Sequence, residues 1–167
     1  MMMQSHQDMK SNNINLEIKK FFESLPNQIN LELKKFKKIS VRNKKKEAFD
    51  PVTNIDKNIE KFIRKKISNI FPHHKILGEE MKDKRTNSDY TWIIDPIDGT
   101  KNFLMGMPVW SNLIGLFHKN ISIAGLANYP VLNVYYLSLK GKTFKYNKNK
   151  KMQIKCNKKQ IKILKLL

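Results

Sequence analysis

The pattern of apolar residues changes at Pro72, and this change constrains the fold more than any other feature of the sequence. Before Pro72, apolar side chains recur mostly three or four positions apart, as they do on one face of an α-helix. After it, short apolar runs are separated by turn residues, which is typical of successive β-strands. A chain with helices first and strands afterwards is predicted to form an α+β fold.

Two helical segments are predicted in the first part of the chain. The first lies within residues 14–39, as one long helix or two short ones, because Pro26 can interrupt a helix or open a new one. The second covers about residues 53–69, and its opening threonine is followed three positions later by Asp56, which is the spacing of a capping box. A polar linker at residues 42–47 separates the two helices.

The second part of the chain contains six predicted strands. They cover residues 75–77, 90–94, 109–118, 122–129, 134–139 and 143–146. The pairs Lys119-Asn120 and Lys140-Gly141 have the composition of hairpin turns. The sheet is therefore predicted to be antiparallel, with the two helices packed on it.

The stretch "WIIDPIDGTKNF" holds two aspartates, Asp95 and Asp98, three positions apart. Pro96 lies between them and fixes one backbone dihedral, so the two acids are held in a defined geometry. Like charges this close raise each other's proton affinity unless a cation lies between them. Because Mg²⁺ typically takes one or two carboxylates together with substrate phosphate, the stretch predicts a magnesium site.

The residues after the second aspartate suit a bound anion. Gly99 allows close approach to the backbone, and a short helix that opened at Thr100 would direct its free N–H groups at a phosphate. Metal and phosphate would then share one turn. The alternative is an ordinary Asp-Gly turn after a strand, since Asp, Pro, Gly and Thr are all common turn residues.

Further acids could reach the same metal. Glu79 and Glu80 follow a glycine at the end of a predicted strand, in the stretch "ILGEE". Taken alone, this pair would be a solvated loop, and Asp56 taken alone would be a helix-capping acid. These acids can be interpreted as one metal site only when their order along the chain is considered together with the two aspartates.

The stretches "DPVTNID", "ILGEE" and "WIIDPIDGTKNF", in this order, resemble the inositol monophosphatase superfamily of metal-dependent phosphomonoesterases over about residues 34–146. The stretches "FLMGMPVWSNLIGL" and "LANYPVLNVYY" are more similar to its histidinol-phosphate phosphatase branch than to the inositol branch. The resemblance implies the N-terminal part of a layered α/β sandwich of the fructose-bisphosphatase type. It also implies a hydrolase for a small phosphorylated alcohol, with histidinol phosphate favoured and inositol monophosphate next.

The resemblance also implies a set of metal ligands, for two or three Mg²⁺ ions. Glu79, Asp95 and the backbone carbonyl of Ile97 would hold one ion. Asp95 and Asp98 would share a second ion. In this arrangement Asp95 bridges the two ions.

Two further roles are implied for residues beside these ligands. Asp56 and the hydroxyl of Thr100 would orient the attacking water and help to deprotonate it. The backbone N–H groups of Gly99 and Thr100 would hold the phosphate. No covalent phospho-enzyme is required, because two cations can neutralise the phosphate and activate a water directly.

The resemblance ends before the family pattern does. Family members continue into a second α/β region with a W-D-x-A-A-G-like motif, which supplies another metal ligand, and no acidic residue occurs between Tyr129 and Leu167 to replace it. We therefore expect a disordered segment at 1–13, a metal-binding phosphatase domain at 14–150 and a truncated basic tail at 151–167, with the C-terminal domain absent. Activity of this chain alone is expected to be weak or absent, and its candidate partners are a second copy or a separate C-terminal half.

The charge of the chain leaves a second function open. With 33 Lys+Arg against 14 Asp+Glu, the net charge is +19, so a degenerate phosphatase-like domain could bind nucleic acid or polyanions through residues 34–46 and 140–159. We favour a solvated lysine surface, because arginine is scarce and no aromatic-basic motif of single-strand binders occurs. The single cysteine and the lack of a signal peptide or an apolar span predict a cytoplasmic protein without a membrane partner.

Overall fold

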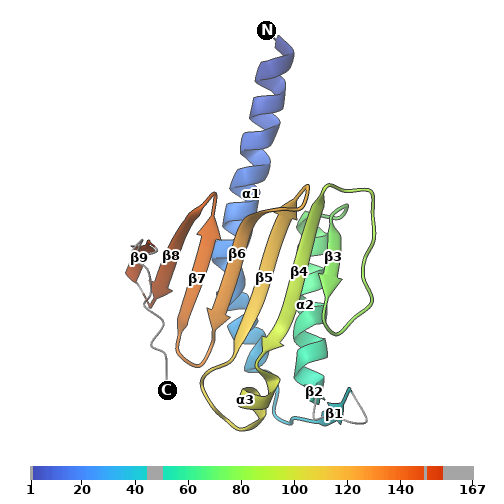
Figure 1. Ribbon diagram of the computed structural model, residues 1–167, viewed down its shortest axis with the longest axis vertical. Coiled ribbons are helices and arrows are strands. Elements are labelled where there is room, and N and C mark those ends of the chain that lie inside the picture. Colours follow the sequence, from blue (N-terminus) through green and yellow to red (C-terminus); the bar gives the residue numbers. More distant parts are fainter. Residues whose placement is uncertain (1, 45–50, 149, 156–167) are drawn as a thin grey trace, which may run out of the picture.

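The computed structural model describes residues 2–44, 51–148 and 150–155, with side chains from residue 13 onward. Two long helices lie against one face of a seven-stranded sheet, and a two-stranded sheet lies at one end of the molecule (Figure 1). The predicted α+β class, with two helices on a mostly antiparallel sheet, is confirmed. No helix in the described part of the chain is both long enough and apolar enough to cross a membrane.

Helix α1, Met2–Leu33, is one continuous helix with Pro26 inside it. The proline cannot donate a hydrogen bond to the carbonyl four residues earlier, but the helix is held on both sides of it by a buried stripe. The stripe consists of Ile18, Phe21, Phe22, Leu25 and Ile29. The helix includes residues 2–13, for which disorder was predicted, because a helix can extend from a packed turn through local hydrogen bonds alone.

Helix α2, Asn54–Ile70, begins with the predicted capping box. The Thr53 side chain accepts hydrogen bonds from the N–H groups of Ile55 and Asp56, and the Asp56 carboxylate accepts one from the Thr53 N–H at 2.9 Å. The apolar face of the helix is buried against α1 and the sheet. The fully buried apolar residues of this helix are Ile59, Ile63 and Ile67.

The large sheet has the strand order β3-β4-β5-β6-β7-β8-β9, so each strand lies beside its neighbour in sequence. The strands are β3 Lys75–Gly78, β4 Tyr90–Asp98, β5 Ser111–His118, β6 Ile121–Tyr129, β7 Val134–Leu139, β8 Lys142–Asn147 and β9 Lys150–Ile154. All neighbours are antiparallel except β3 and β4, which are parallel. All six predicted strands are present.

Three strands were not predicted. Strand β1, Val41–Asn43, overlaps the predicted polar linker, and it pairs with β2, Pro51–Thr53, which lies between that linker and α2. Strand β9 begins at the end of the predicted domain and continues into the predicted basic tail, so that part of the tail is ordered as a sheet edge. The rest of the tail, residues 156–167, lies outside the described residues.

Both predicted hairpin turns are confirmed. Lys119 and Asn120 have φ values of 49° and 64°, and Lys140 and Gly141 have values of 49° and 72°. Two successive residues with positive φ form the type of turn whose twist matches the twist of the flanking strands. The turns therefore fix the registers of β5 with β6 and of β7 with β8.

An aromatic cluster joins the helices to the sheet around Trp92, which is fully buried in β4. The indole ring stacks on Phe22 at 5.3 Å and meets Phe21 edge-on at 5.2 Å, both from α1. Its N–H group donates a hydrogen bond to Nδ1 of His74 at 3.0 Å. This buried hydrogen bond requires a neutral ring nitrogen on His74.

The environment of His74 is expected to make folding stability pH-dependent. Burial, with a smaller contribution from Lys84, lowers the pKa of His74 to about 4. In the unfolded chain a histidine takes up its proton near pH 6.5, so the unfolded state binds more protons between pH 6.5 and 4. The contribution of His74 to stability is therefore fully present above pH 6.5 and is lost as the pH falls, by about 2 kcal/mol between pH 7 and pH 5.

Urea unfolding at pH 7 and pH 5 measures this contribution when the parent is compared with a variant of His74. In His74→Gln, whose amide oxygen can still accept from the indole, the loss between the two pH values is expected to shrink by about 2 kcal/mol. His73 is the exposed neighbour of His74, and the matched control His73→Gln should show the same change in stability between the two pH values as the parent. An unchanged loss in His74→Gln would mean that other groups control the pH response.

The sheet face opposite the helices remains uncovered within the described residues (Figure 1). A shallow, mainly apolar hollow of about 500 Å³ lies on this face, and its lining includes Ile93, Leu113 and Phe117. Ile93 is 44% exposed, which is unusual for a central strand. Asp95 lies in the same hollow, so one predicted metal ligand opens onto this face.

Candidate active site

The predicted acidic residues meet where β3 and β4 end. In the parallel pair, Gly78 lies opposite Ile94, and the N–H of Glu79 donates to the carbonyl of Ile94 at 3.2 Å. Because parallel strands bring their carboxyl ends to the same edge of the sheet, Glu79 comes beside Asp95. The structure therefore brings together two acids that are 16 positions apart in sequence.

A β-bulge spreads the DPID turn. Asp95 lies opposite Leu113, and Asp98 lies opposite Ser111, so four residues of β4 face three residues of β5. The bulge is held by Asn112, which is fully buried and donates to the carbonyl of Pro96 at 2.6 Å. This role of Asn112 could not be predicted, because in a sequence a buried asparagine inside a strand looks the same as a solvent-facing one.

Asp95 is the acid of this cluster whose charged form is most disfavoured by its surroundings. Its Oδ1 atom is buried and has no hydrogen-bond partner among the described residues. Burial first, and then the charge and hydrogen bond of Glu79 and the charge of Asp98, raises the pKa of Asp95 to about 7. A carboxyl group in this position is stabilised as an anion only when a cation lies beside it.

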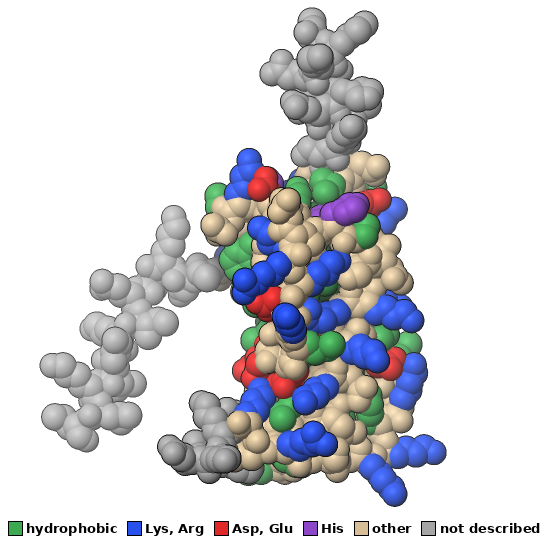
Figure 2. Space-filling model, turned by 90° about the vertical axis from the view of Figure 1, so that its right-hand side faces the viewer, with side chains coloured by type: hydrophobic (Ala, Val, Ile, Leu, Met, Phe, Trp, Pro, Cys, Tyr) green, Lys and Arg blue, Asp and Glu red, His purple; other side chains and the backbone are tan. Residues whose placement is uncertain are grey.

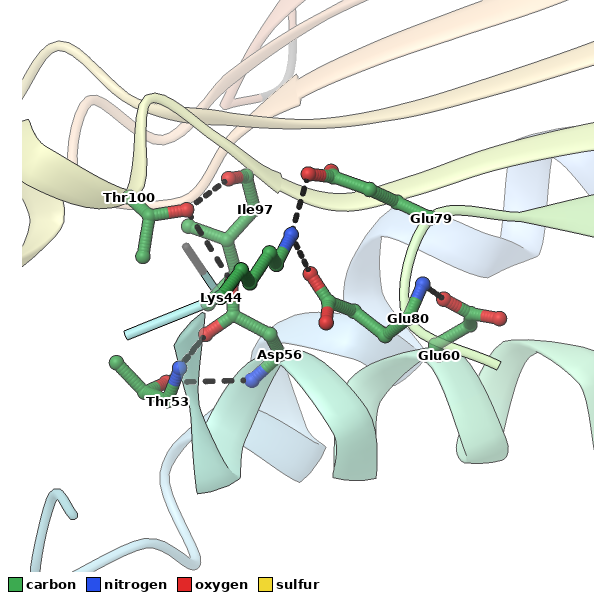
Figure 3. Close-up of polar contacts among 8 residues, drawn as sticks. All are labelled: Lys44, Thr53, Asp56, Glu60, Glu79, Glu80, Ile97 and Thr100. Atoms are coloured by element: carbon green, nitrogen blue, oxygen red, sulfur yellow. Dashed lines mark hydrogen bonds and ion pairs between the residues drawn. The ribbon is translucent and has the colours of Figure 1, made fainter. Parts of the chain in front are cut away.

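Asp56, Thr100 and Ile97 form a hydrogen-bonded group at the start of α2 (Figure 3). The Asp56 carboxylate, 1% exposed, accepts from the Thr53 hydroxyl through one oxygen, and its other oxygen lies 3.3 Å from the Thr100 hydroxyl. The same hydroxyl lies 3.0 Å from the carbonyl of Ile97. The structure thus brings the predicted catalytic pair into contact and places it beside a predicted metal ligand.

Asp98 and Gly99 complete the turn. The Asp98 carboxylate accepts a hydrogen bond from the Ser111 hydroxyl at 3.2 Å. Gly99 has a φ of 84°, a left-handed conformation that favours glycine, and it is followed by the short helix α3, Thr100–Leu104. The predicted short helix is therefore confirmed, and the predicted contacts of its first N–H groups with phosphate stay a prediction.

Lys44 was not singled out by the sequence, yet it lies within the acidic cluster (Figure 3). Its Nζ atom lies 2.6 Å from Oε1 of Glu79 and 2.5 Å from Oε1 of Glu80. Burial alone would lower the pKa of Lys44, but its hydrogen bonds to both glutamates outweigh this and raise it. Burial also raises the pKa of Glu80, although Lys44 opposes the shift.

Glu60 supports the loop that carries the two glutamates. It is fully buried in α2, and its carboxylate accepts from Nε of Arg64 and from the backbone N–H of Glu80, both at 2.7 Å. The only signal in the sequence is the spacing of Glu60 and Arg64, four positions apart, which is typical of an exposed helix pair. Its burial and its contact with the loop could not be predicted from that spacing.

Gly78 packs directly against the ion pair of Glu60 and Arg64, so a side chain at this position is expected to be destabilising. A Cβ atom there would lie 2.1 Å from Oε1 of Glu60 and 2.7 Å from Nη2 of Arg64. Since that ion pair is buried, Gly78→Ala is expected to lower the free energy of unfolding by about 1–3 kcal/mol. Gly125→Ala, in a strand position with no heavy atom within 4 Å, is the control for urea unfolding and should change it by less than ~0.5 kcal/mol.

The donors suit a hard divalent cation, although they are not arranged as a ready ligand set. Among the described residues, no three His, Cys, Asp or Glu side chains are gathered as metal ligands. Glu79 is paired with Lys44, and Asp98 accepts from Ser111. The unpartnered oxygen of Asp95 and the surrounding oxygen donors nevertheless fit Mg²⁺, which prefers carboxylates, carbonyls and water.

Comparison with known proteins identifies the family. The sequence model described as "Inositol monophosphatase family" matches residues 13–166. The chain belongs to the inositol monophosphatase family. The expectation drawn from the three motifs is confirmed, and so is the fold that it implied.

Two curated relatives and one solved structure illustrate the match. The chain is 35% identical over 121 residues to a fructose-1,6-bisphosphatase/inositol-1-monophosphatase of Aquifex aeolicus, covering 72% of this chain and 45% of the relative. It is 35% identical over 104 residues to a histidinol-phosphatase of Mycobacterium tuberculosis, covering 62% and 40%. An IMPase/NADP phosphatase in complex with Mg²⁺ and phosphate superposes with a TM-score of 0.72 at 25% identity, covering 79% of this chain and 51% of that one. The chain thus spans about half the length of these family members, or less.

Proposed function

We propose that this chain carries the metal-binding part of a phosphomonoesterase site, which uses Mg²⁺ to hydrolyse a small phosphorylated alcohol. The observation that carries the proposal is Asp95, a half-buried acid whose Oδ1 atom is buried without a partner and whose pKa is raised by burial and by the charges of Glu79 and Asp98. This arrangement costs stability unless a cation occupies it. A position that is unfavourable in the metal-free fold and favourable with a metal is typical of a functional site.

The ligands that we propose for these ions are those implied by the family motifs. Glu79, Asp95 and the carbonyl of Ile97 would hold one Mg²⁺, and Asp95 with Asp98 would hold another. Bound Mg²⁺ supplies charge neutralisation for the phosphate and lowers the pKa of a coordinated water. The solved IMPase/NADP phosphatase that superposes on this chain was crystallised with Mg²⁺ and phosphate, which supports the choice of ion.

Asp56 and Thr100 are proposed to remove the proton from the attacking water. The Thr100 hydroxyl has one proton, which it can donate either to Ile97 or to Asp56. When the hydroxyl donates to Asp56, its oxygen is free to accept a hydrogen bond from a water. The buried Asp56 carboxylate then stabilises the positive charge that develops as the water loses its proton.

The preferred substrate is proposed to be histidinol phosphate, with inositol monophosphate next. Relatives named as histidinol-phosphatases occur in Mycobacterium tuberculosis and in Chlorobaculum parvum, at 35% and 38% identity. In these 167 residues a second Mg²⁺ would have only Asp95 and Asp98 as side-chain ligands, because no acidic residue follows Asp98. We therefore propose slow turnover by this chain alone, and a second copy or a separate C-terminal half as the partner that completes the site.

The distribution of surface charge favours the proposed phosphatase function over nucleic-acid binding. In Figure 2, lysine and arginine side chains are scattered over the whole visible face and do not gather into one stripe. A nucleic-acid surface usually concentrates its positive charge along a groove or a helix. The scattered lysines are better explained as solvated side chains.

The test combines binding and turnover by the purified chain. Histidinol phosphate is expected to bind in calorimetry only when Mg²⁺ is present, more tightly than inositol monophosphate, whereas histidinol without phosphate should not bind. Phosphate release is expected to require Mg²⁺ and to be slower than ~1 s⁻¹, the low end for enzymes. Ester binding that is unchanged by EDTA, or that is absent with Mg²⁺, would contradict the proposal.

A further inference from the structure

Lys44 supplies a positive charge at the point where the proposed site requires one. Its ammonium group lies between the carboxylates of Glu79 and Glu80 (Figure 3). The side chain of Glu80 is 4% exposed, that of Lys44 is 24% exposed and that of Glu79 is 45% exposed, so Glu80 is the shielded member of the cluster. A buried glutamate beside a second acid is destabilising when no cation is near.

The backbone of both glutamates is held in place, whereas the lysine is the adjustable partner. The N–H of Glu79 donates to the carbonyl of Ile94, and the N–H of Glu80 donates to the carboxylate of Glu60. Lys44 reaches the same acids from the end of β1 on a flexible four-carbon side chain. If a second cation enters the cluster, the side chain that can move away is therefore Lys44.

We propose that Lys44 is a built-in counter-ion of Glu79 and Glu80 that competes with the divalent cation for the carboxylate of Glu79. The inference rests on the metal site of the proposed function and goes beyond it. The ammonium and a divalent ion need the same carboxylate, and two positive charges within about 4 Å of each other repel in a site that is partly shielded from water. Lys44 thus stabilises the metal-free fold and weakens metal binding, and binding of the metal must displace it.

Calorimetric titration with Mg²⁺ tests the competition. Lys44→Met is expected to bind Mg²⁺ about tenfold more tightly than the parent, since one competing charge is removed. Lys44→Arg keeps the charge and should bind no more tightly than the parent. Lys57→Met removes the same charge from an exposed position on α2 and should leave the affinity within about twofold.

The outcomes separate this inference from the proposed function. Equal or weaker binding by Lys44→Met, while the parent binds Mg²⁺ and Asp95→Asn does not, would overturn the role of Lys44 and leave the metal site standing. An absence of Mg²⁺ binding in the parent and in both Lys44 variants would overturn both. Tighter binding confined to Lys44→Met would support the competition.

A second measurement uses the parent protein alone, and so does not depend on a variant that folds. Amine labelling followed by mass spectrometry should show slow modification of Lys44 without metal, because its Nζ atom is paired with two carboxylates. At saturating Mg²⁺ its modification should accelerate severalfold, while that of Lys57 stays constant. Unchanged labelling of Lys44 in the metal-saturated protein would overturn the proposal.

Discussion

Asp95→Asn is expected to abolish Mg²⁺ binding without weakening the metal-free fold. The substitution removes the charge of the proposed bridging ligand, so we expect the affinity for Mg²⁺ to fall at least ~100-fold. In the metal-free protein the same substitution removes repulsion from Glu79 and Asp98, and the stability in EDTA should stay equal or rise. Calorimetric titration and urea unfolding in EDTA measure the two effects separately.

The matched control is Asp89→Asn. Asp89 is 61% exposed and forms only a long ion pair with Lys119, at 3.8 Å, so the same loss of charge should leave both quantities nearly unchanged. If Asp95→Asn kept its affinity for Mg²⁺ within about threefold, Asp95 would not be a ligand. If the variant were instead strongly destabilised in EDTA, its carboxylate would have a structural role.

Glu60→Ala is expected to cause the largest loss of stability, about 3–5 kcal/mol in the free energy of unfolding. It removes the carboxylate partner of Arg64, whose guanidinium keeps only its hydrogen bond to the carbonyl of Met81 among the contacts described, and it removes the acceptor of the Glu80 N–H. Breaking one half of a buried ion pair is costly because the other half stays buried and charged. Urea unfolding of the metal-free protein measures the effect.

Two further variants test whether the loss of stability in Glu60→Ala arises because the ion pair is buried. Glu60→Gln keeps an oxygen acceptor for the Glu80 N–H and should lose less than Glu60→Ala. Glu32→Ala removes an exposed helix pair with Lys35, at 2.7 Å, and should cost less than ~1 kcal/mol. The interpretation is excluded if Glu60→Ala costs no more than Glu32→Ala.

Much of the fold follows from local patterns. The capping box of α2, the turns at Lys119-Asn120 and Lys140-Gly141 and the short helix after Gly99 are each determined by neighbouring residues, and all were predicted. Strands β1 and β2 have three residues each, too few for an alternating pattern, and β9 consists largely of polar residues at the edge of the sheet. These strands depend on their partners, so the sequence pattern did not reveal them.

In the candidate site, too, residues close together in the sequence could be predicted, whereas contacts between distant residues could not. Asp95, Asp98 and Thr100 lie within one short stretch, and their proximity could be predicted from it. The contributions of Lys44 and Glu60 depend on contacts with a loop 20 to 35 positions away. In a chain with 33 Lys+Arg, one more lysine carries no signal, and only the tertiary structure distinguishes it.

The order of the strands also bears on how the protein folds. From β4 to β9 each strand pairs with the next one along the chain, so these contacts are local and can form hairpin by hairpin. The acids gather only when β3 joins β4 and α2 packs against them, which requires longer chain closure. If the site is assembled after the rate-limiting step, Mg²⁺ should slow unfolding and leave the folding rate unchanged, as stopped-flow measurements with and without Mg²⁺ would show. The metal would then lengthen the lifetime of the folded chain without helping it to fold.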